Sequence, residues 1–88
     1  IHMRIKSLLG MKVLDTDAKE IGKVIDVEFD KDSGEIKKVF ISLKKNFLSS
    51  NEIEVRYDDI KSIGDYLLLD IDYWMINVIL FINRNILL

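Results

Sequence analysis

Residues 20–43 read EIGKVIDVEFDKDSGEIKKVFISL and carry the clearest structural signal in the chain. Two runs rich in β-branched and aromatic residues, 20–29 and 36–43, flank the polar sequence Asp30-Lys31-Asp32-Ser33-Gly34. Such a polar stretch between two strand-like runs is typical of a hairpin loop, and glycine readily adopts the left-handed conformation that these loops need. The stretch therefore predicts a β-hairpin closed by a loop that contains Gly34.

The strand at 36–43 alternates between two faces, as expected of a strand that buries only one of them. One face carries Val39, Ile41 and Leu43, and the other carries Lys38, Phe40 and Ser42. The aliphatic face is expected to point into the core. Phe40 is then a candidate for outward display.

The strand at 20–29 has a less regular pattern. Its alternation places Ile25, Val27 and Phe29 on one face and Asp26 and Glu28 on the other. Val24 does not fit this alternation, and Gly22 stands two residues earlier. Such a slip beside a glycine predicts a bulge that bends the strand around a barrel.

Shorter runs of the same kind occur on both sides of the hairpin. They span residues 11–14, 52–57, 60–63 and 66–71, and a polar connection covers 44–51. Closing so small a sheet on itself removes most of its exposed edges and lets alternate side chains fill the interior. We therefore expect an all-β protein, a small five- or six-stranded barrel.

The composition bounds the class of protein. The chain has 88 residues, enough for one domain, with 49% hydrophobic and 32% charged residues, no cysteine and a net charge of -2. This excludes disulfides and cysteine-bound zinc, and it gives no broad positive field for nucleic acid. Residues 1–2 are interpreted as a remnant of recombinant expression, which removes His2, the only histidine, from consideration as a catalytic or metal-binding group.

The acidic residues invite a metal-site hypothesis, since they occur in the pairs Asp15/Asp17, Asp30/Asp32 and Asp58/Asp59. A calcium loop needs glycine at its sixth position and glutamate at its twelfth, whereas counting from Asp30 gives Glu35 and Ile41. Aspartates of this kind usually form turns. We expect no metal, no cofactor and no catalytic residue.

Four lysines could form a basic strip for RNA, with Phe40 and Phe47 as stacking faces. They are Lys37, Lys38, Lys44 and Lys45. Solvated lysines of strands and loops are the favoured interpretation, because the acidic balance of the chain opposes a long-range positive field.

Residues 73–88 read YWMINVILFINRNILL and differ in composition from the rest, with Arg84 as their only charge. The apolar run is shorter than the roughly 20 residues of a membrane-spanning helix. The segment is expected to pack on another copy of the chain. Folding back on its own domain, contact with a membrane surface and a non-native extension are the alternatives.

The predicted protein interface combines the outward aromatic of the hairpin with this tail. Its residues are Phe40, Tyr73, Trp74, Val78 and Phe81, with charges at Glu52, Glu54 and Arg56 setting orientation at the rim.

Several segments together resemble the PRC-barrel family, named after the cytoplasmic domain of the photosynthetic reaction centre H subunit. They read SLLGMKVLD at 7–15, IGKVIDVEFD at 21–30 and GEI at 34–36, and the stretch 55–69 is similar to the last strands of the family. The resemblance covers residues 3–72 and leaves the tail, 73–88, outside. The family often has a glycine where Ala18-Lys19 stand and a proline where Arg56-Tyr57 stand.

The resemblance implies a binding role without catalytic residues. PRC-barrels form the second half of a ribosome maturation factor, where they dock a ribosomal protein, and they occur as short stand-alone archaeal proteins linked to cell division. The chain resembles the stand-alone type. We therefore expect a cytoplasmic, homo-oligomeric adaptor that binds another protein, and the alternative is a factor of RNA metabolism or ribosome maturation that binds a ribosomal protein or RNA.

Overall fold

The computed structural model describes residues 2–44, 52–72, 75–76, 78 and 81–82, and it is all-β as expected. Its elements are α1 (Ile5–Leu8), β1 (Lys12–Leu14), β2 (Glu20–Phe29), β3 (Ile36–Leu43), β4 (Glu52–Arg56), the 3₁₀ turn η1 (Tyr57–Asp59), β5 (Ile60–Ile63) and β6 (Leu67–Leu69). The short helix α1 was not anticipated from the sequence.

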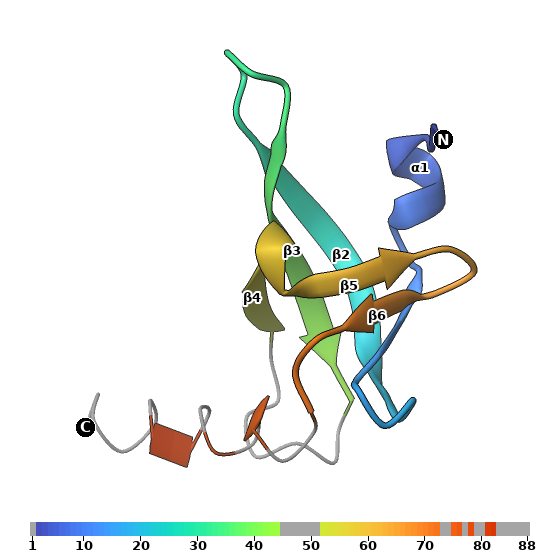
Figure 1. Ribbon diagram of the computed structural model, residues 1–88, viewed down its shortest axis with the longest axis vertical. Coiled ribbons are helices and arrows are strands. Elements are labelled where there is room, and N and C mark those ends of the chain that lie inside the picture. The colour runs from blue at the N-terminus through green and yellow to red at the C-terminus, as the bar shows by residue number, and fades with distance from the viewer. Residues whose placement is uncertain (1, 45–51, 73–74, 77, 79–80, 83–88) are drawn as a thin grey trace.

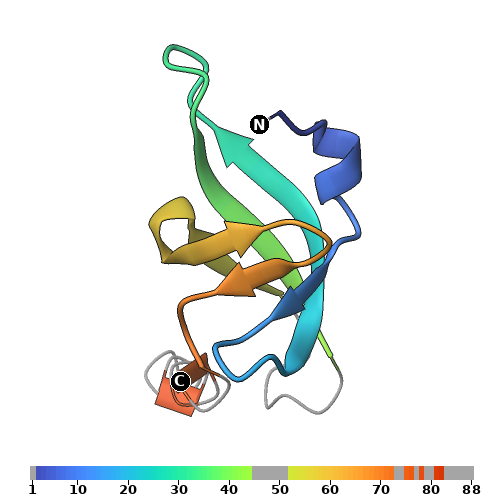
Figure 2. The same ribbon diagram turned by 45° about the vertical axis from the view of Figure 1, so that its right-hand side comes forward.

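The six strands form one curled sheet in the order β4-β3-β2-β1-β6-β5. β1 and β6 are parallel, and the other neighbouring pairs are antiparallel. Figures 1 and 2 show that β5 and β6 cross over the face of β2 and β3, so that the sheet wraps around its own interior. The edge strands β4 and β5 follow one another in the chain through η1. The sheet curls around one aliphatic interior, which confirms the predicted small barrel.

The predicted hairpin is confirmed as β2 and β3, the longest strands of the sheet. Its loop is held by Asp30, whose carbonyl accepts the N–H of Gly34 at 2.7 Å and whose carboxylate accepts the N–H of Asp32 at 2.8 Å. Gly34 has φ +77°, the left-handed conformation that the sequence predicted for it.

The predicted irregularity of β2 is present, but it lies one residue later than the alternation suggested. The pairing of β2 with β3 shifts between Val24 and Asp26, so Ile25 is the extra residue. Val24 is buried and Val27 packs against the core, whereas Ile25 is 45% exposed. Phe29 is also exposed, and the pairing shifts again between Glu28 and Phe29. The prediction that Ile25, Val27 and Phe29 share one face is therefore wrong, because each shift interrupts the alternation.

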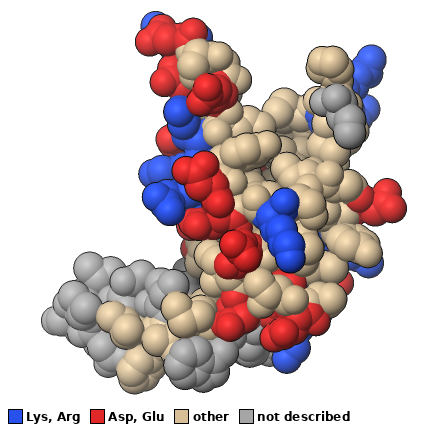
Figure 3. All heavy atoms as spheres, in the orientation of Figure 1, with Lys and Arg blue, Asp and Glu red and all other residues tan. Residues whose placement is uncertain are grey.

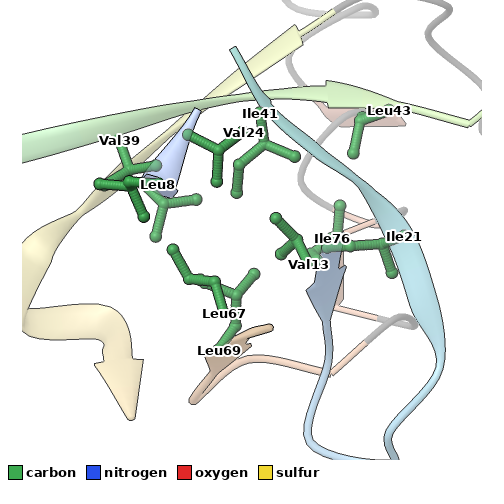
Figure 4. Packing of buried hydrophobic residues seen from close by; sticks show 11 residues of the cluster. Leu8, Val13, Ile21, Val24, Val39, Ile41, Leu43, Leu67, Leu69 and Ile76 are labelled. Atoms are coloured by element: carbon green, nitrogen blue, oxygen red, sulfur yellow. The ribbon is translucent and has the colours of Figure 1, made fainter. Parts of the chain in front are cut away.

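Aliphatic side chains from nearly every element fill the interior (Figure 4). The buried set is Leu8, Val13, Ile21, Val24, Val39, Ile41, Leu43, Val55, Leu67, Leu69 and Ile76. Val39, Ile41 and Leu43 all point inward, which confirms the alternation predicted for β3. Burial of one such side chain stabilises the fold by about 1.5–3 kcal/mol, so this cluster is the main source of stability.

The turn after β1 depends on one buried carboxylate. Asp15 is fully buried, and its side chain accepts the backbone N–H groups of Asp17 and Lys19, each at 2.9 Å. Ala18 has φ +62°, a left-handed conformation, at the position where the PRC-barrel family often has glycine. Ala18 therefore adopts the left-handed conformation that a glycine would adopt more easily at this turn.

The tail folds back on its own domain at Ile76, which is 3% exposed and belongs to the core cluster. The side chain of Asp72 accepts the N–H of Met75 at 2.7 Å, and its carbonyl accepts the N–H of Ile76 at 3.2 Å, which starts a helical segment. The alternative of folding back therefore holds at this residue, because its side chain completes the barrel interior. No helix of the described residues is long and apolar enough to cross a membrane.

Gly22 should be irreplaceable in this fold. A Cβ at this position would overlap the backbone carbonyl of Ser42 on β3. We expect Gly22→Ala to lower the free energy of unfolding by at least about 2 kcal/mol, because backbone cannot move aside without breaking the pairing of β2 with β3. Urea denaturation measures this. Gly64→Ala is the control, since nothing lies within 4 Å of its added methyl group, and an equal loss in both variants would contradict the steric argument.

Truncation of the buried tail residue should also be costly. We expect Ile76→Ala to lower the free energy of unfolding by about 2–4 kcal/mol through the cavity that it leaves. Ile82→Ala, at an exposed position of the same segment, should change it by less than about 0.5 kcal/mol. Similar denaturation midpoints for Ile76→Ala and the unmodified protein would show that the tail is not part of the core.

Candidate functional site

Phe40 lies on the outer face of the barrel, where the sequence placed it, and is half-buried there. It stands opposite Asp26 of β2 and Glu54 of β4 in the two antiparallel registers. Directly paired residues share one face of a sheet, so the ring lies between two carboxylates. On this part of the outer face, an aromatic side chain therefore has acidic neighbours on both adjoining strands.

The other predicted interface residues belong to the tail. Val78 is half-buried and Phe81 is exposed, and each has helical backbone conformation. Tyr73 and Trp74 lie outside the described residues. The predicted interface is thus divided between two elements, the middle of β3 and the tail.

The lysines predicted to contact RNA are each next to a carboxylate. The side-chain nitrogens of Lys37, Lys38 and Lys44 lie 3.2, 3.4 and 3.9 Å from oxygens of Glu35, Glu54 and Glu20. Lys37 and Lys38 are also consecutive in a strand, so they point to opposite faces. Lys45 lies outside the described residues. The strip is therefore neither continuous nor strongly positive where the structure describes it.

A different set of cations has no ion pair with any described residue. Lys12 of β1 and Lys23 of β2 are directly opposite in the antiparallel register, and Arg4 and Lys6 lie on or beside α1. Like charges opposite one another destabilise a sheet slightly, so the Lys12 and Lys23 pair would gain from an anionic contact. The sequence gives one signal for this region, because residues 2–14 contain no acidic residue.

An apolar surface lies at one end of the barrel, between α1 and the β2–β3 hairpin. Figure 3 shows the hairpin and the N-terminal segment on two sides of a hollow whose visible surface is mostly uncharged. We call this hollow the apolar groove. It measures about 220 Å³ and is lined by Met3, Arg4, Ile5, Leu8, Ile36, Tyr57 and Ile63. Met3, Ile5 and Tyr57 are each nearly half exposed, so apolar surface here faces solvent.

A second hollow, the charged groove, continues from the first. It measures about 310 Å³ and is lined by Glu35, Ile36, Lys37, Lys38, Arg56, Tyr57 and Asp58. Ile36 and Tyr57 border both grooves, so the two form one surface with an apolar and a charged end. Arg56, predicted for the rim of an interface, lies here, with its Nε 3.4 Å from a carboxylate oxygen of Asp59.

This surface was missed in the sequence because it joins four distant segments. Tyr57 was assigned to the end of a strand, but it begins η1, and its side chain therefore leaves the alternation of β4. The available signal was the spacing of Ile5 and Leu8, which are three residues apart, as on one face of a helical turn. Arg4 precedes this pair and Lys6 lies within it, so the turn is amphipathic.

The described residues contain no group of three or more acidic, histidine or cysteine side chains that could hold a metal ion. The carboxylates of Asp15 and Asp30 instead accept backbone hydrogen bonds of their own turns. This agrees with the interpretation of these aspartates as turn residues.

Comparison with solved structures supports the fold. A crystal structure described as a 16S ribosomal RNA processing protein, RimM, from Pseudomonas aeruginosa matches with a TM-score of 0.60 at 17% identity. The match covers 80% of this chain and 44% of that one, so the chain spans less than half the length of RimM. At this identity the likeness concerns the fold alone. No curated protein matches the chain.

The sequence itself matches the family model of the PRC-barrel domain over residues 1–73. The curled six-stranded sheet and its inward aliphatic side chains agree with that match. The chain therefore belongs to the PRC-barrel domain family.

Proposed function

We propose that this chain is a non-enzymatic protein-interaction module, a cytoplasmic adaptor that docks another protein on the surface of its barrel. The observation that carries the proposal is the apolar groove, where Met3, Ile5 and Tyr57 expose apolar surface around a concave site. Exposed apolar side chains grouped in a hollow are typical of surfaces that bind protein side chains. The assembly served would be one of the kind implied for stand-alone PRC-barrels, such as cell division.

The second candidate is a factor of RNA metabolism or ribosome maturation. It is supported by the fold shared with RimM and by the four cations Arg4, Lys6, Lys12 and Lys23, which have no ion pair with described residues. These cations offer electrostatic contacts to phosphate groups. The two candidates differ in the class of macromolecule that contacts the barrel.

Site-specific photo-crosslinking in cells separates the candidates. A photoreactive phenylalanine analogue in place of Tyr57 should give adducts that protease degrades and ribonuclease leaves intact. The same analogue in place of Tyr66, an equally exposed tyrosine outside the groove, should give few adducts. Ribonuclease-sensitive adducts at position 57 would support the RNA candidate and contradict the adaptor.

We also propose that copies of the chain associate through the exposed part of the tail, which includes Met75, Phe81 and Ile82. A charge there should weaken the contact, because an ion cannot be buried in an apolar interface without a partner. Light scattering after size-exclusion chromatography should give a lower mass for Phe81→Glu than for the unmodified protein. Phe29→Glu, at the exposed end of β2, is the control. Equal masses for all three proteins would remove the tail from any association.

A further inference from the structure

We propose that the two joined grooves bind an extended segment of a partner protein that carries an apolar anchor side chain beside carboxylates. This rests on the proposed function and specifies its site and the chemistry of its partner. Three features of the same surface support it: the apolar lining, an arginine that forms no ion pair with a described residue, and an open strand edge.

The apolar groove has the size and lining for one or two inserted side chains. Its walls are α1 and the start of β3, with Tyr57 and Ile63 from η1 and β5 between them. An aliphatic or aromatic side chain that enters would cover surface on Met3, Ile5 and Tyr57, which are each about half exposed. Burial of one such side chain would strengthen binding by about 10- to 100-fold, before the entropic cost of ordering the segment.

The charge that distinguishes the site is Arg4. The two grooves are lined by four cations, Arg4, Lys37, Lys38 and Arg56, and by two anions, Glu35 and Asp58. Glu54 and Asp59 lie 3.4 Å from Lys38 and Arg56, so the charges around the two grooves sum to zero, but the described residues that line the apolar groove include one cation, Arg4, and no anion. The apolar groove therefore complements an apolar side chain that has a carboxylate beside it.

The cations of the site are available for a partner. Arg4 forms no ion pair with a described residue. The other cations form ion pairs between exposed side chains. Examples are Lys37 with Glu35 at 3.2 Å and Arg56 with Asp59 at 3.4 Å. Exposed ion pairs of this kind contribute little to stability, so a partner carboxylate can replace them at little cost.

The third feature is an open edge of β3. β4 pairs with β3 only from Lys38 to Ser42, because the chain leaves β4 at Arg56 and turns into η1. The described residues therefore provide no strand beside Ile36 and Lys37 on this side, and the charged groove lies along that edge. An extended segment can donate and accept backbone hydrogen bonds at such an edge while it places alternate side chains into the groove.

The shape of the site favours a peptide over other anionic partners. A hollow between two projecting elements accepts a narrow chain, whereas a membrane surface would contact only the projections. Single-stranded RNA would require several aromatic stacking faces, and among the described residues that line the two grooves Tyr57 is the only aromatic one.

Selection from a random peptide library displayed on phage tests the chemistry directly. The full 88-residue chain is the bait, and Tyr57→Ala is used for counter-selection. The enriched peptides should combine a leucine, isoleucine or phenylalanine with aspartate or glutamate within a few positions. Enrichment of basic peptides, or no enrichment over the counter-selected pool, would overturn the inference.

Affinity measurements then locate the site. Fluorescence anisotropy with a labelled peptide from the selection should show about tenfold weaker binding to Tyr57→Ala. Arg4→Glu should weaken binding about fivefold at low salt and less at high salt, because a screened charge contributes less. Tyr66→Ala and Lys61→Glu, exposed residues outside both grooves, are the matched controls. Circular dichroism confirms that each variant is folded, and equal losses in the controls would place the peptide elsewhere.

The outcomes separate this inference from the proposed function. Suppose that position 57 gives protein adducts, but the phage selection enriches basic peptides or none. The proposed adaptor function would then remain supported, and the acidic, apolar segment would be rejected as its partner. Ribonuclease-sensitive adducts would reject both.

Discussion

The register shift at Ile25 is the constraint on which the rest of the structure depends. β2 is ten residues long and serves two purposes, since its first half is a wall of the barrel and its second half projects beyond it as one arm of the hairpin. The extra residue allows Val24 and Val27 to face the core on both sides of the shift. With unbroken alternation, one of these two valines would point outward. The shift therefore joins a closed core and a projecting hairpin within one strand (Figure 1), and Ile36 of this hairpin lines the apolar groove.

The close approach of β2 and β3 near Gly22 supports the same arrangement from the other end of the hairpin. Because no side chain fits between this glycine and the carbonyl of Ser42, the two strands lie in close contact there. On the outer face, Lys38 of β3 lies 3.4 Å from Glu54 of β4, whereas Lys12 and Lys23 stand opposite each other on β1 and β2.

The fold could be predicted to a large extent, because hairpin, turn and strand signals are local in sequence. The loop from Asp30 to Gly34, the inward face of β3 and the barrel class all depend on neighbouring residues and on alternation. The facing of Ile25 could not be predicted, because the sequence shows that a slip exists but gives no register against β3. The candidate site was mostly missed, since the grooves combine α1, Ile36, Tyr57 and Ile63, which only the closure of the sheet brings together. Phe40 was placed correctly on the outer face because parity alone determines it.

Ile76 has a consequence for where the folding unit ends. The family match stops at residue 73, yet a fully enclosed side chain three positions later fills the interior beside Val13 and Ile21 (Figure 4). Domain limits drawn from the family pattern alone would omit it. A fusion junction or an expression boundary chosen for this barrel should therefore lie well beyond residue 76.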